Sequence, residues 1–277
     1  MNPDTLRKLQ LVELEILQQI DKICKNNGIS YFLDSGTALG AVRHGGFIPW
    51  DDDVDVGMLR EEYDRFIEIA RNELDSRYCL QTRENEPDFG KYSAKIRKRG
   101  TIFPEKNSEN LKERGIFVDI YPFDYTDSDL KKAGRHINKA RKMLLLLRFI
   151  QIKEKRASIV KRIIHAAAKL LIPEKKLEQR YLKHCKKYAA SRSSNITCFS
   201  YRMARDRNLI FSLEMMTPSV KIQFEGNEFL IMNNADYYLK IMYNDYMKLP
   251  PEEKRISHIT GEVVFDCGET EHKNEKN

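Results

Sequence analysis

The most informative segment of the sequence runs from position 36 to position 55 and reads Gly36-Thr37-Ala38-Leu39-Gly40-Ala41-Val42-Arg43-His44-Gly45-Gly46-Phe47-Ile48-Pro49-Trp50-Asp51-Asp52-Asp53-Val54-Asp55. Its Gly-Thr turn stands between an apolar run at 29–33 and a helical pattern at 38–42. Such a turn offers backbone N–H groups and a hydroxyl at a helix N-terminus. Glycines and a proline then end the helix, and 54–58 has the pattern of a strand. This order predicts that a phosphate-binding turn and an acidic strand end meet in one place.

The acidic run places the carboxylates of Asp51, Asp52, Asp53 and Asp55 within five positions. If Asp53 and Asp55 lie on a strand, alternation points both side chains to the same face. Two such carboxylates repel each other, and a hard divalent cation keeps both ionised. We therefore expect a Mg²⁺ site suited to phosphoryl transfer, with Mn²⁺ as an alternative ion and Asp51 and Asp52 as supporting loop residues. A solvated acidic loop is the alternative interpretation.

The same aspartates have the spacing of the first ligands of an EF-hand loop, and Glu62 stands at the twelfth position. However, the sixth position, which an EF-hand fills with glycine, is Val56. Glycines and a proline also occupy the place of the preceding helix. The spacing therefore does not indicate an EF-hand.

Periodicity along the 277 residues predicts an α+β fold with a mixed sheet flanked by helices. We expect a catalytic core over 1–130, a basic helical subdomain over 131–205 and a C-terminal hairpin and helix over 206–277 that packs back on the core. The predicted helices are 4–26, 38–42, 61–74 and 235–246, and the predicted strands are 29–33, 54–58, 78–82, 92–97, 116–121, 220–224 and 228–232.

Composition excludes several classes of protein. No apolar run approaches the roughly 18 residues of a membrane-spanning helix, and the N-terminus lacks the pattern of a secretory signal. The five cysteines are far apart and form no C-x-x-C, which argues against a disulfide framework or a cysteine zinc site. We therefore expect a cytoplasmic protein.

Basic residues are concentrated in one segment. Between Lys131 and Lys187 there are 19 lysines and arginines against three acids, and an amphipathic helical pattern covers 159–171. This asymmetry indicates a local anionic partner rather than general nucleic-acid binding. A basic amphipathic helix suits an anionic membrane surface, such as the inner face of the cytoplasmic membrane. An ordinary helical subdomain with a solvated basic face is the alternative.

The whole stretch from Gly36 to Val56 resembles the motif of the LicD family, within the nucleotidyltransferase (polymerase-β-like) superfamily. LicD proteins are phosphocholine transferases that modify bacterial cell-surface glycans, and fukutin-related proteins share their core. The likeness continues at Lys95-Ile96-Arg97 with Thr101, at 115–122 and at 243–251. Asn244 stands where relatives more often carry glycine, and 143–200 matches no motif.

The resemblance implies roles for five residues. It assigns Gly36 and Thr37 to the donor phosphate, and Asp53 and Asp55 to the metal ions. Asp119 would be the third carboxylate, which either completes the metal site or accepts the proton of the acceptor hydroxyl. The alternative for Asp119 is a strand-end residue that caps a loop.

Four basic residues are candidate phosphate contacts. Arg43 and His44 either bind the diphosphate or cap the short helix. Lys95 and Arg97 are expected to share one strand face, where they either bind phosphate or are solvated.

Three aromatic residues are candidates for a choline site, because a quaternary ammonium group favours aromatic faces. Trp50 either forms one wall of such a site or anchors the core. Tyr121 and Phe123 are the further candidates.

The function implied by the resemblance is Mg²⁺-dependent transfer of phosphocholine from CDP-choline to a sugar hydroxyl, with release of CMP. The acceptor would be a lipid-linked glycan, such as a precursor of teichoic acid, lipopolysaccharide or capsule. CDP-ribitol and CDP-glycerol are alternative donors. A nucleotidyltransferase acting on nucleic acid or a small molecule, and a non-catalytic membrane-surface scaffold, are the rival classes.

Overall fold

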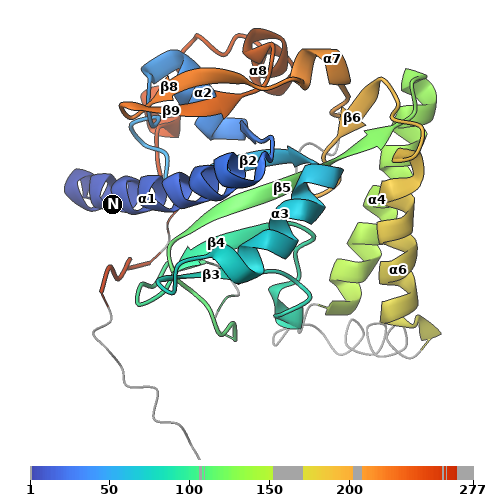
Figure 1. Ribbon diagram of the computed structural model, residues 1–277, viewed down its shortest axis with the longest axis horizontal. Helices are drawn as coiled ribbons and strands as arrows, with labels where there is room; N and C mark the ends of the chain where they lie inside the picture. The colour runs from blue at the N-terminus through green and yellow to red at the C-terminus, as the bar shows by residue number, and fades with distance from the viewer. Residues whose placement is uncertain are drawn as a thin grey trace, which may run out of the picture. The chain divides into compact units, whose positions relative to one another are not determined.

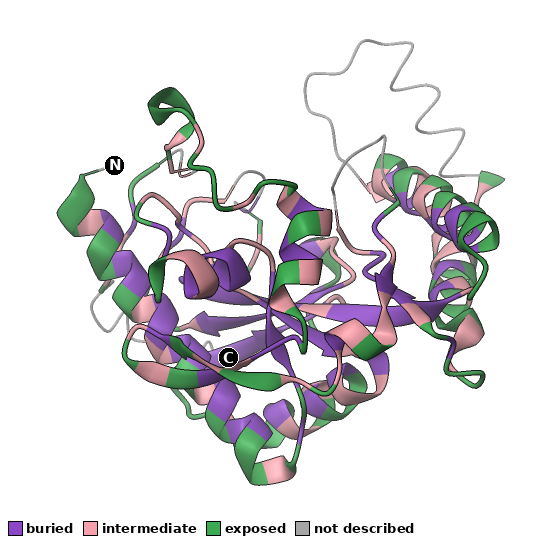
Figure 2. Cartoon of the chain, turned by 90° about the horizontal axis from the view of Figure 1, so that it is seen from above, coloured by how far each residue is buried: buried purple, intermediate pink, exposed green. Residues whose placement is uncertain are grey.

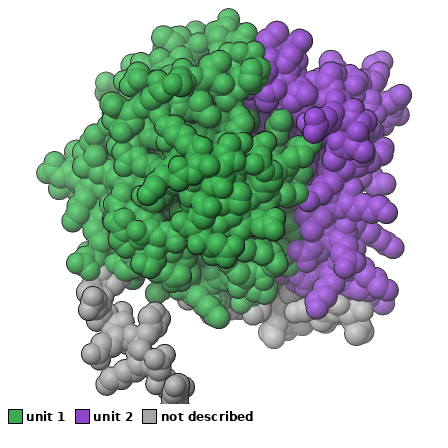
Figure 3. Space-filling model, in the orientation of Figure 1, with its two compact units in different colours: residues 1–121, 218–277 green, residues 122–217 purple. Residues whose placement is uncertain are grey.

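The computed structural model describes residues 2–105, 108, 110–151, 171–201, 208–257, 259 and 261–266. The chain forms two compact units, 1–121 with 218–277 and 122–217 (Figure 3). The domain boundaries predicted from the sequence fall after positions 130 and 205, whereas the compact units divide after positions 121 and 217. Most of the basic helix predicted over 159–171 lies outside the described residues.

The first unit is built on a mixed sheet (Figure 1). Strand β1 pairs parallel with β9, whereas the β1–β2, β3–β4, β4–β5 and β8–β9 pairs are antiparallel. The predicted mixed sheet flanked by helices is therefore confirmed. Across the sheet, the order is β3 (Tyr78–Gln81), β4 (Ala94–Lys98), β5 (Phe117–Thr126), β2 (Asp55–Leu59), β1 (Phe32–Leu33), β9 (Asn227–Ile231) and β8 (Val220–Phe224).

The register of the central strands brings together residues that are far apart in the sequence. Lys95 on β4 stands directly opposite Asp119 on β5. The backbone N–H of Asp119 donates to the carbonyl oxygen of Val54 at 2.9 Å, just before β2 begins. The acidic run and the third predicted carboxylate therefore meet at one end of β2.

Helix α1 (Pro3–Asn27) covers the sheet together with α3 (Arg60–Glu73). The Asn2 side chain caps α1 by accepting from the N–H of Asp4, and Gly28 ends the helix at φ +58°. The apolar stripe of α1 is buried, and Figure 2 shows the buried and exposed faces along it. Burial of this stripe is the main reason for the helix to be stable.

Helix α2 (Ser35–His44) begins three residues earlier than predicted, because Asp34 caps it by accepting from the N–H of Ser35 at 2.8 Å. It packs against α8 (Ala235–Tyr243), and the hydroxyl of Tyr238 donates to the same Asp34 carboxylate. The Gly-Thr turn is therefore the first turn of the helix. The short helices η1 (Pro87–Phe89) and η3 (Glu252–Lys254) complete the helices described in this unit.

In the second unit, α4 and α6 pack against each other. His136 of α4 and His184 of α6 face each other, and a ring nitrogen of each lies within 3.0 Å of the other's carbonyl oxygen. The apolar run 143–150 lies in the C-terminal part of α4. No helix among the described residues is long and apolar enough to cross a membrane. The elements of this unit are α4 (Leu130–Gln151), α6 (Glu174–Cys185), η2 (Lys186–Tyr188), β6 (Asn195–Thr197), β7 (Phe211–Ser212) and α7 (Leu213–Met216).

Candidate active site

The acidic run forms a loop that leads into β2. Because β2 begins only at Asp55, Asp53 lies before the strand, and the expected alternation of Asp53 and Asp55 along one strand is wrong. Ligand oxygens of Asp51, Asp52 and Asp53 instead gather within 4.8 Å of one another. The loop conformation allows three successive side chains to converge, which an extended strand does not.

The first turn of α2 holds this loop in place. The hydroxyl oxygen of Thr37 accepts from the backbone N–H of Asp55 at 2.9 Å. A Cβ added to Gly36 would lie 2.6 Å from Oδ2 of Asp51, so only glycine allows that carboxylate to approach the helix so closely. The predicted phosphate turn and the predicted metal ligands are therefore in direct contact.

Crowding of negative charge makes these carboxylates hard to ionise in the absence of a cation. Burial, together with Asp53 and Asp119, raises the pKa of Asp55 well above its usual range. Burial, Asp53 and Asp52 raise the pKa of Asp51 to about 8. A divalent cation would relieve this repulsion, so the electrostatics of the cluster suit cation binding.

Asp119 faces the cluster from β5 and is held by lysines. Lys95 is fully buried, and its Nζ lies 3.2 Å from Asp119 Oδ2 and 2.9 Å from Glu105 Oε1. Asp119 Oδ1 is buried without a hydrogen-bond partner, with Lys91 Nζ 3.7 Å away. Burial lowers the pKa of Lys95 to about 7, while Asp119 opposes this shift.

Arg97 shares the strand face of Lys95, as predicted, but it is enclosed by protein groups. Its guanidinium donates to Gln81 Oε1 at 2.7 Å, to the Gly115 carbonyl at 2.6 Å and to Glu105. A side chain with no exposed surface and three protein acceptors offers no face to a phosphate. The prediction that Arg97 contacts substrate therefore does not fit, and Arg97 supports Glu105 instead.

Arg43, His44 and Trp50 lie together at the partly exposed end of α2. Arg43 donates to the carbonyl oxygen of Tyr246 at 2.7 Å and to His44 Nε2 at 3.0 Å. The His44 ring meets Trp50 edge-on at 6.3 Å, and the guanidinium of Arg255 lies over Trp50 at 5.5 Å. Cationic groups therefore lie beside the acidic loop, and the ring face of Trp50 contacts one of them, the guanidinium of Arg255.

Two tyrosines lie on elements that border this region. Tyr121 is half-buried on β5, two residues after Asp119, and alternation places both on the same face. Tyr243, at the end of α8, is close enough to the carboxylates that burial and the charge of Asp55 raise its pKa well above the usual range. A phenol that stays protonated is a hydrogen-bond donor.

Phe123 is fully buried on β5 and lies in the second unit.

Sequence reasoning missed Glu13, Glu105, Tyr243 and Arg255. Glu13 carries a detectable signal, because it stands on the apolar stripe of α1, where a carboxylate is unexpected. Tyr243 lies inside a stretch that carried the family resemblance. Glu105 and Arg255 lie in loops without a periodic pattern, so only the folded chain identifies them.

The chain is similar in sequence to several known proteins. A family model described as LicD/FKTN/FKRP, nucleotidyltransferase domain, matches residues 28–158, which include the acidic loop and Asp119. The lipopolysaccharide cholinephosphotransferase LicD of Haemophilus influenzae is 31% identical over 266 residues, covering 94% of this chain and 98% of that protein. The chain belongs to the LicD family. The ribitol 5-phosphate transferase FKRP of Homo sapiens is 33% identical to this LicD-family chain over 125 residues, 44% of the chain and 21% of FKRP. The chain is accordingly a phosphotransferase.

Proposed function

We propose that this phosphotransferase moves phosphocholine from CDP-choline to a sugar hydroxyl of a bacterial cell-surface glycan and releases CMP. The observation that carries the proposal is the likeness to a lipopolysaccharide cholinephosphotransferase over almost its full length, including the whole acidic loop. That relative favours a lipopolysaccharide-type acceptor over teichoic acid or capsule. FKRP and FKTN, named as ribitol phosphate transferases, favour CDP-ribitol as the alternative donor.

The fold we assign to the first unit is nucleotidyltransferase-like, and the site fits a divalent cation. Asp119 Oδ1 is a buried oxygen without a hydrogen-bond partner, and Asp55 is surrounded by other carboxylates. Asp53, Asp55 and Asp119 would hold Mg²⁺ or Mn²⁺, which neutralises charge on the donor phosphates when bound.

The chain's own residues then supply positioning. The N-terminus of α2 at Gly36 and Thr37 receives the donor phosphate, and Arg43 and His44 face the rest of the diphosphate. The acceptor hydroxyl attacks the phosphorus that bears choline, the bond to the bridging oxygen breaks, and CMP leaves with the bond electrons. Asp119 either accepts the hydroxyl proton or serves only as a ligand, and Lys95 orients its carboxylate. Trp50 and Tyr121 are the aromatic candidates for the choline group.

Donor identity is tested by ligand-dependent thermal stabilisation. The wild-type protein with Mg²⁺ is heated alone and with CDP-choline, CDP-ribitol, CDP-glycerol or nucleoside triphosphates. We expect CDP-choline to raise Tm most, and chelation of Mg²⁺ to remove the effect. A larger rise in Tm with CDP-ribitol would indicate that ribitol phosphate, rather than phosphocholine, is the transferred group. A rise in Tm with triphosphates alone would favour a nucleotidyltransferase.

Catalysis is tested with Asp53→Asn, which keeps the size of the side chain and removes its charge. Phosphocholine transfer is expected to be lost while circular dichroism and thermal unfolding remain those of a folded protein. Asp88→Asn, which changes an exposed aspartate after β3, is the matched control and should retain activity. Turnover near the wild-type rate in Asp53→Asn would contradict the assignment.

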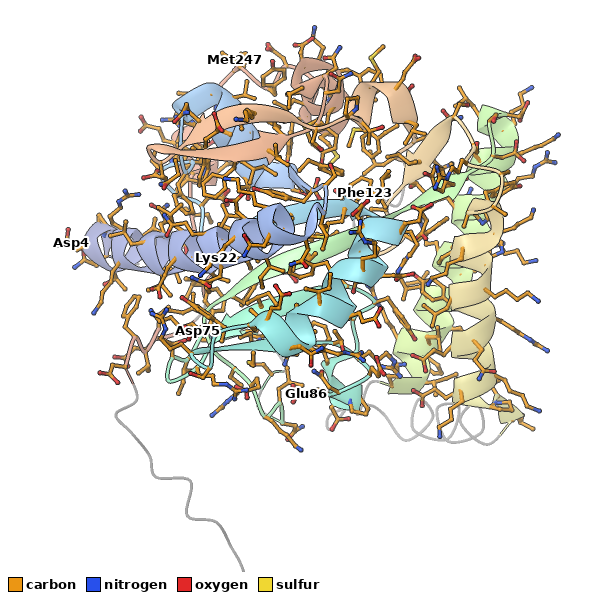
Figure 4. The ribbon with its side chains drawn as sticks, in the orientation of Figure 1. Asp4, Lys22, Asp75, Glu86, Phe123 and Met247 are labelled. Atoms are coloured by element: carbon orange, nitrogen blue, oxygen red, sulfur yellow. The ribbon has the colours of Figure 1, made fainter. Side chains whose placement is uncertain are left out.

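We further propose that the basic second unit binds the anionic surface of the membrane that carries the acceptor lipid. On α4, exposed apolar side chains, Leu145 (58% exposed) and Phe149 (41% exposed), follow a cationic half. Side chains tipped with nitrogen also extend outward from α6 (Figure 4). Each Lys or Arg near an anionic surface contributes about 1 kcal/mol. The exposed basic residues of α4 are Lys131, Lys132, Arg135, Lys139 and Lys142.

Membrane binding is measured by co-sedimentation with phosphatidylglycerol vesicles at increasing salt. Replacing Lys131, Lys139 and Lys142 with Gln is expected to weaken binding about 100-fold or more at low salt. The control replaces three exposed lysines of the first unit, Lys22, Lys112 and Lys248, and so changes the net charge equally. Equal binding by the two triple variants would reject the α4 surface as the membrane-binding site.

A further inference from the structure

Trp50 carries a cation on its ring, and that cation comes from the C-terminal part of the chain. The guanidinium of Arg255 lies 5.5 Å from the centroid of the Trp50 ring. Trp50 is half-buried and immediately precedes the acidic loop. Two residues after Arg255, the hydroxyl of Ser257 donates to Asp52 Oδ2 at 2.8 Å. The segment that carries Arg255 is therefore attached to the acidic loop itself.

The guanidinium of Arg255 has one edge bound by protein and one edge available to a ligand. Its Nε donates to the carbonyl oxygen of Pro250 at 2.8 Å, whereas its terminal nitrogens form no hydrogen bond with the part of the chain that the structure describes. The ion pair with Glu252 is 3.9 Å long and that carboxylate is 89% exposed, so the pair contributes little. Arg97, by contrast, is enclosed by three protein acceptors.

Arg43 presents a second guanidinium beside the same loop. It donates from Nη1 to the Tyr246 carbonyl oxygen at 2.7 Å and from Nε to His44 Nε2 at 3.0 Å. Both acceptors are neutral, because a histidine nitrogen that accepts a hydrogen bond carries no proton. Burial and then the charge of Arg255 lower the pKa of Arg43, while Asp51 opposes the shift. Two cations that are held by neutral groups and repel each other favour an anion beside them.

The shape of these groups indicates which anion they bind. A guanidinium that lies on an aromatic ring and is held at one edge presents a planar pair of donors, which matches the oxygens of a phosphate. On the basis of the proposed CDP-linked donor, we propose that Arg255 and Arg43 together bind its diphosphate, and that Trp50 positions Arg255 rather than enclosing choline. The ring face that holds Arg255 is closed to a quaternary ammonium group, which leaves Tyr121 as the aromatic candidate.

The fluorescence of Trp50 reports on this site directly, because Trp50 is the only tryptophan of the chain. Wild-type protein with Mg²⁺ is titrated with CDP and, separately, with choline chloride. We expect CDP to change the emission of Trp50, because the diphosphate binds the arginine on its ring, and choline to leave the emission unchanged. A change with choline, or no change with CDP, would overturn the proposal.

The contribution of Arg255 is measured by calorimetric titration of variants with CDP. Arg255→Gln should raise the Kd for CDP about 10-fold or more, because a charge-assisted contact with phosphate is lost. Arg255→Lys should fall between this variant and wild type, since it keeps the charge and loses the planar pair of donors. Lys254→Gln, which removes an exposed charge one position earlier, is the matched control and should bind CDP like wild type. Equal affinity in Arg255→Gln and Lys254→Gln would overturn the role of Arg255.

Trp50→Leu separates a residue that positions Arg255 from a wall of a choline site. Loss of the ring should raise the Kd values of CDP and CDP-choline by the same factor, about threefold or more, because both ligands carry the diphosphate. A loss of affinity confined to CDP-choline would overturn the proposal and assign Trp50 to choline. Wild-type protein that binds neither ligand would refute the proposed donor and this inference together, whereas unaltered CDP binding in the variants would refute this inference alone.

Discussion

The side-chain oxygen of Thr37 accepts a hydrogen bond from the backbone N–H of Asp55 at 2.9 Å. This bond joins the first turn of α2 to the first residue of β2. The residue assigned to the donor phosphate therefore also fixes the position of a proposed metal ligand. Its hydroxyl proton remains available to donate, because the bond to Asp55 uses only a lone pair.

Replacing Thr37 with Val should lower the free energy of unfolding by about 1–3 kcal/mol, because the partly buried N–H of Asp55 loses its acceptor. Phosphotransferase activity should fall by more than the loss of stability alone explains, because Asp55 loses its support. Chemical denaturation and transfer assays measure the two effects. Thr37→Ser keeps the hydroxyl and is expected to restore both, and equal losses in Val and Ser would exclude the hydrogen bond as the cause.

Gly36→Ala should displace the carboxylate of Asp51, because the added Cβ would lie 2.6 Å from its Oδ2. We expect a loss of about 1–3 kcal/mol in stability, as for overpacking in a core. The control is the same change in an Asp51→Ser background, where the opposing oxygen is gone. If alanine is equally destabilising in both backgrounds, the close contact is not its cause.

Glu105→Gln should be severely destabilising, by about 3–5 kcal/mol, because it leaves the buried cations Lys95 and Arg97 without their shared anion. Glu84→Gln, at an exposed ion pair with Arg71, is the control and should change stability by less than about 1 kcal/mol. Urea unfolding compares the two variants. A mild effect at Glu105 would show that Lys95 and Arg97 do not depend on Glu105 as their shared anion.

The stability of the metal-free protein should fall as pH rises from about 4 to 8. The pKa of Asp51 is about 8 in the folded protein against 3.8 ordinarily, so the folded state binds more protons than the unfolded state in this window. The stabilisation that comes from protonated Asp51 is complete below pH 3.8 and is lost as the pH rises through about 8. Unfolding in EDTA across this range measures the slope. Asp51→Asn should make the slope less negative, and an unchanged slope would contradict the shift.

Asn244 ends α8 at φ +59°, a conformation that favours glycine. Glycine, which the family resemblance leads us to expect here, adopts such a conformation without strain. Asn244→Gly should be neutral or stabilising by up to about 1 kcal/mol, whereas Asn244→Ala should be destabilising by about 1 kcal/mol. Thermal unfolding distinguishes the two, and greater stability of the alanine variant would contradict the role of the turn.

Sequence patterns predicted most helices and strands of the first unit, and they predicted that the Gly-Thr turn and the acidic run meet. Apolar periodicity is a local property, so it predicted α1, α3 and the hairpin of β8 and β9 to within a few residues. The motif order likewise identified the LicD family. It also predicted that Asp55 and Asp119 act together, and in the fold the charge of Asp119 contributes to raising the pKa of Asp55. Strand alternation failed at Asp53, because a loop conformation depends on contacts with Gly36 and Thr37 that periodicity does not encode.

The sequence did not predict which charged residues face the acidic cluster and which of them support the others. Lys95 and Arg97 share one strand face, yet Arg97 is satisfied entirely by Gln81, Gly115 and Glu105, and Lys95 reaches Asp119. Arg255 is far from Trp50 in the sequence and lies over its ring only because the chain returns to the acidic loop in the fold. The physical reason is that burial and electrostatic coupling depend on distance in space, which sequence spacing fixes only within a single helix or strand.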